Sequence, residues 1–213
     1  WNKNSYVRTS WEEKNISDLC EINNQNITSK DTNFYYIDLS AVSAGEIDYP
    51  KDLINLKNAP SRAKRKCKKN DILISNVRPN LKGFAIIEKD IPNLVASTGF
   101  SVLRCKKSYL NIVYSFFYSN HISNKINSIV TGSSYPAMNS SDVANFVIKV
   151  PKNEGKAEIL GKYLATTEKE IKEFKKLKNQ VALQKQALMH QLLTGKIRVK
   201  IWIIIMSFHL VKH

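Results

Sequence analysis

The last third of the chain holds a stretch that favours one long helix over any other structure. From Lys156 to Thr194 there is no proline and one glycine, Gly161, and the composition is dense in Lys, Glu, Gln and Leu. Apolar residues recur at alternating spacings of four and three, which places them on one helix face. About 38 residues at 1.5 Å per residue give a rod of roughly 57 Å. A small domain cannot cover a rod of that length, so the apolar face must pack elsewhere.

We expect this face to be a dimerisation or partner-binding seam. Its apolar members are Leu160, Leu164, Ile171, Phe174, Val181, Leu188 and Leu192. Polar residues at Thr167, Lys178 and Lys185 interrupt the seam, and polar positions in a coiled-coil core fix register while lowering affinity. A helix that lies back on its own domain is the alternative to a coiled coil.

The residues before the helix have a sequence pattern typical of a mixed α/β (α+β) domain, with short apolar runs broken by Asn, Gly, Pro and Ser. The stretch 109–129 has helical spacing and predicts one helix or two shorter ones. Short runs of β-branched and aromatic residues bounded by turn residues predict strands at 34–39, 72–75, 84–87 and 100–103.

Pro151 marks the boundary, because proline cannot sit inside a helix and a polar loop follows it. We therefore predict a globular domain over residues 1–152, one long coiled-coil-forming helix over residues 153–199 and an apolar tail over residues 200–213. The tail's apolar run, 201–211, is too short to span a bilayer, which needs about 20 apolar residues.

Charge predicts the class of partner. Lys and Arg number 33 against 18 for Asp and Glu, which gives a formal net charge of +15, so phosphate is the expected counter-charge. The cations cluster between Asp52 and Asp71, where there is no acid, at Lys57, Arg62, Lys64, Arg65, Lys66, Lys68 and Lys69. A Lys-rich solvated surface that reflects only compositional habit is the alternative, and the clustering argues against it.

The cysteines indicate the cellular compartment of the protein more than any chemical role. Cys20, Cys67 and Cys105 are isolated and odd in number. This spacing predicts neither a disulfide framework nor a zinc site, and a reducing cytoplasm fits it.

Six motifs, in order along the chain, resemble the specificity (S) subunit of type I restriction-modification enzymes. The likeness runs from about Trp11 to Val199. The motifs are RAKR at 62–65, NDILIS at 70–75, VRPNLKGFA at 77–85, ASTGFSVLR at 96–104, TGSSYPAMN at 131–139 and QKQALMHQLLTGKIRV at 184–199. The family's full-length subunit has two DNA target-recognition domains, each followed by a long helix, whereas this sequence has one of each. The resemblance therefore implies a half subunit or part of a longer one.

The sequence departs from the family pattern in three places. The loop 24–29 lacks the Gly and Pro of the family's usual first loop. Asn70 stands where the family often has Gly, and asparagine is well suited to positive φ. Residues 201–213 match nothing in the family.

The residues and the resemblance together give a set of DNA-binding candidates. The cations of the basic run should contact phosphates, which positions the protein without specifying sequence. Pro79 should stiffen the loop 77–83 and Gly83 should permit positive φ there, so that polar side chains face DNA. The candidates are Arg62, Lys64, Arg65, Lys66, Lys68, Lys69, Arg78, Asn80, Lys82, Ser133, Ser134 and Tyr135. Turn capping by Asn80, an internal ion pair for Arg78 and core packing of Tyr135 are the alternatives.

Catalytic alternatives fail on their own motifs. The Gly195-Lys196 pair has Ile197 where a phosphate-binding loop needs Ser or Thr, and the four histidines lack metal-ligand spacing. No methyltransferase-like tetrapeptide or glycine-rich cofactor loop is present, and the cluster 168–172, which resembles a nuclease E-x-K, is typical of solvated charge on a helix. We expect no catalytic residue, no cofactor and no metal.

The favoured function is a sequence-specific subunit that directs methyltransferase (M) subunits and, through them, restriction (R) subunits to a bipartite target in double-stranded DNA. By resemblance, paired helices set the spacing of two half-sites, and a half subunit would achieve this as a homodimer. A free-standing DNA-binding regulator and an oligomerisation scaffold without specific DNA binding are the alternatives.

Overall fold

The computed structural model of the chain describes residues 10–130 and 137–198. These residues form two compact units, with the boundary after Thr166. The first unit contains two four-stranded sheets, two two-stranded ladders and several short helices among its described residues. The second is the continuation of a helix.

The central sheet is antiparallel and has the order β2-β11-β8-β9. Its strand β8 is buried on both faces, because Ile72 and Ile74 pack toward one core cluster and Leu73 toward another. This double burial explains the uninterrupted apolar run. The strands are β2 (Cys20–Ile22), β11 (Phe100–Cys105), β8 (Ile72–Ser75) and β9 (Phe84–Ile86).

The second sheet has the order β6-β3-β10-β7, with a parallel β3–β10 pair and antiparallel outer pairs. Its strands are β6 (Ile54–Asn55), β3 (Asn33–Ile37), β10 (Leu94–Ser97) and β7 (Ala63–Lys66). The basic run thus supplies an edge strand, which its lysine content did not predict. Pairing with β10 and burial of Ala63 outweigh the low strand propensity of lysine.

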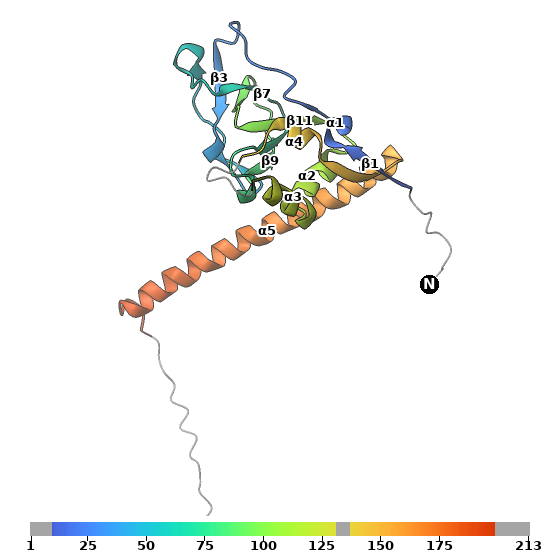
Figure 1. Cartoon of the computed structure of the whole chain (residues 1–213). Coiled ribbons are helices and arrows are strands. Elements are labelled where there is room, and N and C mark those ends of the chain that lie inside the picture. Colours follow the sequence, from blue (N-terminus) through green and yellow to red (C-terminus); the bar gives the residue numbers. More distant parts are fainter. Residues whose placement is uncertain (1–9, 131–136, 199–213) are drawn as a thin grey trace, which may run out of the picture. The chain divides into compact units, whose positions relative to one another are not determined.

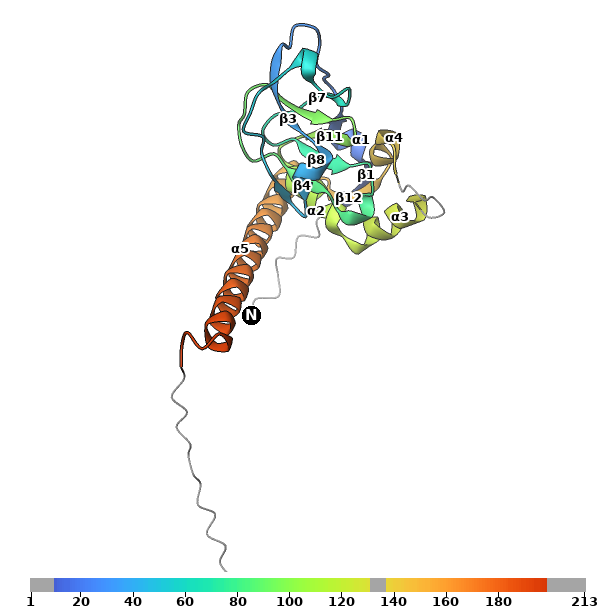
Figure 2. The same ribbon diagram turned by 90° about the vertical axis from the view of Figure 1, so that its left-hand side faces the viewer.

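Helices α2 (Leu110–Tyr118) and α3 (Asn120–Val130) cover the face of the central sheet opposite the second sheet, so the unit has layers (Figures 1 and 2). Of the two possibilities predicted for 109–129, one helix or two shorter ones, the structure has two helices, because Ser119 adopts an extended conformation between them. Two one-turn helices, α1 (Ile16–Leu19) and α4 (Ser140–Ala144), begin with capping boxes.

Short pairings and turns complete the unit. Strand β1 (Trp11–Asn15) pairs antiparallel with β12 (Val147–Pro151), and β4 (Val42–Ser43) pairs with β5 (Glu46–Ile47). In the part of this unit that the structure describes, three 3-10 turns follow strands or loops: η1 (Leu39–Ala41), η2 (Leu56–Asn58) and η3 (Pro79–Leu81).

Helix α5 (Glu154–Leu193) confirms the predicted long helix, with 40 residues. Within the first unit, Ala157 is buried and Leu160 and Leu164 pack against the core, so these two seam residues follow the alternative in which the helix lies on its own domain. The other seam residues are exposed by 38% to 70% and are Ile171, Phe174, Val181, Leu188 and Leu192. No helix within the described ranges is both long and apolar enough to cross a membrane.

Candidate nucleic-acid interface

The structure gathers six predicted phosphate-binding cations on β7 and the segments that flank it. The side chains of Arg65 and Lys66 are half-buried. The other four are exposed: Arg62, Lys64, Lys68 and Lys69. Because β7 is the outer strand of its sheet, these side chains form a basic edge, which is the name used below for residues 62–69.

The loop 24–29 packs against the basic edge. Ile27 donates its backbone N–H to the Lys64 carbonyl at 2.8 Å, and Arg65 Nη1 donates to Asn26 Oδ1 at 3.2 Å. Asn26 and Arg65 also form a β-bridge. The loop 24–29 lacks the Gly and Pro of the family pattern, and its contacts with the edge strand hold it in place instead.

An acid far upstream in the sequence neutralises part of the basic edge. Lys66 Nζ lies 2.6 Å from Asp31 Oδ1, and the Thr28 backbone N–H donates to Asp31 Oδ2 at 2.7 Å. The hydrogen bond from Lys66, followed by that from Thr28, holds the pKa of the Asp31 carboxyl below its ordinary value. Lys66 is thus already paired, a contact that the acid-free run around it did not predict.

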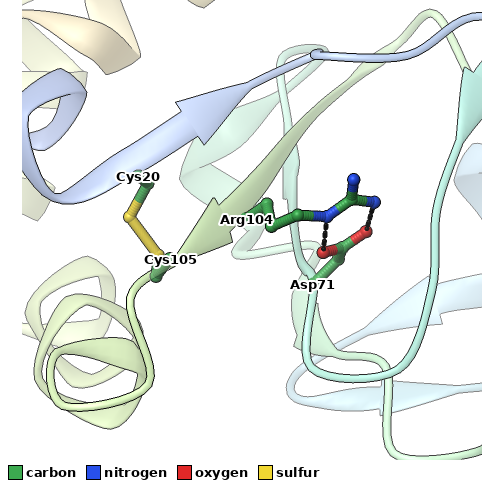
Figure 3. Close-up of a disulfide and its surroundings, with 4 residues drawn as sticks. All are labelled: Cys20, Asp71, Arg104 and Cys105. Atoms are coloured by element: carbon green, nitrogen blue, oxygen red, sulfur yellow. Dashed lines mark hydrogen bonds and ion pairs between the residues drawn. A yellow bond between two sulfur atoms is a disulfide. The ribbon is translucent and has the colours of Figure 1, made fainter.

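An ion pair between half-buried Arg104 and fully buried Asp71 anchors the turn at the end of the basic edge (Figure 3). Arg104 Nε donates to Asp71 Oδ1 at 2.9 Å and Nη2 donates to Oδ2 at 2.8 Å, a two-pronged geometry that strengthens such pairs. Asp71 Oδ2 also accepts the Lys68 backbone N–H at 2.9 Å. These contacts raise the pKa of Arg104, chiefly through its hydrogen bonds to Asp71. Asn70, in the same turn, has φ of 70°, as predicted.

The loop 77–83 presents polar side chains, but by a different backbone route from the one predicted. Positive φ falls on Arg78 (48°) and Lys82 (53°), on either side of η3, and not on Gly83, so that prediction is wrong. Gly83 instead makes a close approach to β8, since a Cβ there would lie 3.2 Å from the Ser75 Cβ.

The side chains of that loop differ in their surroundings. Arg78 and Asn80 are exposed, and neither side chain makes a hydrogen bond or ion pair with any residue in the described part of the chain. Lys82 is half-buried, with Nζ 6.0 Å from the centre of the Tyr118 ring. Recognition of DNA by these three residues stays a prediction.

The described end of the second candidate motif, residues 137–139, lies beside the start of the loop 77–83. Ser133, Ser134 and Tyr135 lie outside the described residues. Directly after them, Ala137 forms a β-bridge with Val77, and Met138 donates its N–H to the Asn76 carbonyl at 2.9 Å. Two motifs that are distant in sequence thus converge.

The prediction that the cysteines form no disulfide is wrong for one pair. Cys20 and Cys105 stand opposite each other in the β2–β11 ladder and are bonded, with 3.9 Å between their Cα atoms (Figure 3). Strand pairing brings them together across 85 residues, which the sequence spacing could not indicate. Cys67 is free and buried, and burial raises the pKa of its thiol.

Comparison with known proteins identifies the family. The model of the type I restriction modification DNA specificity domain matches residues 9–188. The chain belongs to this family. A curated relative, the type I restriction enzyme HindI specificity subunit of Haemophilus influenzae, is 24% identical over 160 residues, which cover 71% of this chain and 34% of that protein.

Solved structures share the fold of this specificity domain. A chain from a structure of complex assembly and conformational transition of the type I R-M system has a TM-score of 0.71 and 25% identity, with 91% of this chain and 51% of that one covered. The HsdS subunit from Thermoanaerobacter tengcongensis has a TM-score of 0.66 and 23% identity, with 88% and 49% covered. The chain therefore spans about half the length of these relatives.

Several family-like motifs of this specificity domain serve the scaffold in the structure. NDILIS forms the turn and β8, and ASTGFSVLR contributes to β10 and β11 and ends on Arg104, the partner of Asp71. The sequence carried one signal for the Arg104–Asp71 pair. Each residue is a charged group beside an apolar strand, the arginine near the end of one strand and the aspartate just before another. Asp31 offered no local signal.

Proposed function

We propose that this chain selects the DNA sequence at which a type I restriction-modification enzyme acts. The match of the DNA specificity domain over residues 9–188 carries this proposal. The basic edge supports it, because exposed cations on an edge strand and the segments beside it can neutralise phosphates along a duplex. In this role the chain performs no catalytic step and needs no cofactor.

The proposed partners are M subunits and, through them, R subunits. Exposed apolar residues on α5 beyond Thr166 support a helix-mediated assembly, because apolar side chains at seam spacing are stabilised when a second helix covers them. A second copy of the chain would supply that helix and an inverted copy of the recognition domain. The DNA target would then be two inverted half-sites with a spacer between them.

Salt-dependent binding tests the DNA contact. Neutralising the four exposed cations of the basic edge to glutamine should weaken binding to all duplexes and reduce the slope of log K against log salt by about 3–4, close to 0.9 per lost phosphate contact. The charge-matched control neutralises four exposed lysines in and just after α5 that lie outside the seam, at Lys169, Lys175, Lys176 and Lys196. Equal slope changes in the two variants would contradict the assignment of the basic edge.

Assembly needs a separate experiment. Co-expression with an M subunit should yield a complex that survives purification, and a truncation that removes residues 169–199 should abolish it while the recognition domain stays folded. Salt-dependent DNA binding without any M-subunit complex would favour a free-standing regulator. Assembly without DNA binding would favour a scaffold.

A further inference from the structure

Asn76 is a buried polar residue whose polar atoms are all used. It follows β8 and is 9% exposed. Its N–H donates to the Gly99 carbonyl at 2.8 Å, and its carbonyl accepts the Met138 N–H at 2.9 Å. Its side chain accepts from Ser101 Oγ at 2.8 Å through Oδ1 and donates to Ser140 Oγ at 3.4 Å through Nδ2.

The hydrogens of this cluster can be assigned by counting. A carbonyl oxygen only accepts, so the single hydroxyl hydrogen of Ser101 goes to Asn76 Oδ1. The 2.8 Å contact between the Ser101 and Ser140 hydroxyls then requires Ser140 to donate. The three side chains form a closed ring of hydrogen bonds, in which each bond polarises the next.

The ring lies beside the two candidate DNA-binding loops and beside the loop that packs against the basic edge. The loop 77–83 starts at the residue after Asn76, and the described end of the second motif reaches Ser140 through residues 137–139. Asn23 Nδ2 donates to Ser140 Oγ at 2.9 Å, directly before the loop 24–29 that packs against the basic edge.

We infer that Asn76, Ser101 and Ser140 are positioning residues for sequence recognition. Ser101 is fully buried, and the ring acts by fixing the loops relative to one another, without touching DNA. A satisfied buried network of this kind rigidifies its surroundings and leaves polar atoms unpaired when one member is removed. This inference rests on the proposed function.

The test compares two buried serines in the full-length chain. Ser101→Ala opens the ring, whereas the control Ser97→Ala removes an equally buried hydroxyl of β10 that accepts the Gly99 N–H at 3.2 Å. A duplex enriched by the wild-type chain from a randomised library is compared with a scrambled duplex of equal composition. The ratio of the two affinities should fall about tenfold for Ser101→Ala, because one buried hydrogen-bond partner is lost, and stay unchanged for Ser97→Ala.

Two further readouts separate positioning from stability. Ser140→Thr, which keeps a hydroxyl, should retain the wild-type ratio, and Ser140→Ala should not. Hydrogen exchange at the Met138 amide should accelerate in Ser101→Ala but not in Ser97→Ala, whether or not DNA is present. Unchanged exchange, or equal loss of discrimination in both serine variants, overturns the inference. A wild-type chain that enriches no sequence overturns the proposed function, and the DNA role of the ring with it.

Discussion

Removing the Arg104 guanidinium would test how the basic edge is anchored. The Arg104→Leu variant leaves the Asp71 carboxylate, whose side chain is 1% exposed, with the Lys68 N–H as its remaining hydrogen-bond donor among the contacts described above. Breaking a buried pair by removing one partner costs about 3–5 kcal/mol, because the remaining charge stays desolvated. At roughly 2–4 °C per kcal/mol for a domain of this size, the melting temperature should fall by roughly 6–20 °C.

Urea denaturation followed by circular dichroism measures the loss. Arg62→Leu is the matched control, because that arginine is exposed and its replacement should change the free energy of unfolding by less than about 0.5 kcal/mol. Arg104→Lys should fall between the two, since a lysine keeps the charge and loses the two-pronged geometry. Similar stabilities for Arg104→Leu and Arg62→Leu would refute the anchoring role.

Three other predictions concern separate parts of the molecule. Thiol titration of the denatured, unreduced chain should find one free thiol, Cys67, and Cys20→Ser should lower the free energy of unfolding by about 2–4 kcal/mol; three free thiols would contradict the disulfide. The Asp31 pKa lies below its ordinary value, so its pairing stabilises the fold above that ordinary value and is lost as pH falls through the lowered one. Asp31→Asn should therefore remove this loss of stability at low pH, which melting scans at a series of pH values would measure. The same variant should steepen the slope of log K against log salt for DNA binding by about 0.9, because it frees Lys66. An unchanged slope would show that Lys66 does not reach phosphate. Phe174→Ala should weaken self-association in light scattering, whereas an unchanged mass would count against the helix seam.

Local signals in the sequence were enough for the elements whose stability is largely local or fully buried. The apolar run of β8 gave its bounds correctly, and the absence of proline after Pro151 gave the start of α5 within one residue and its end within six. Asn70 was placed at positive φ because few other side chains tolerate it.

Features that depend on contacts between distant segments could not be predicted in this way. Strand β7 forms from a lysine-rich run because β10 lies beside it, and the Cys20–Cys105 bond forms because β2 and β11 pair. Gly83 illustrates the same limit, since the fold places this residue close to Ser75 across the β8–β9 turn and does not give it a positive φ.

The same distinction between local signals and long-range contacts applies to the candidate site. Clustering of cations within eight residues of sequence was enough to find the basic edge, whereas its partial neutralisation by Asp31 and its anchor at Asp71 depend on the fold. The hydrogen-bonded ring of Asn76, Ser101 and Ser140 draws on three separate segments, so no single motif contains it.

We propose that this chain determines which DNA sequence its enzyme recognises. Single-molecule sequencing of genomic DNA, in cells that carry an M subunit with or without this chain, measures that directly. Methylation should be confined to one interrupted motif when the chain is present and absent without it. Methylation at the same sites in both cells would contradict the account.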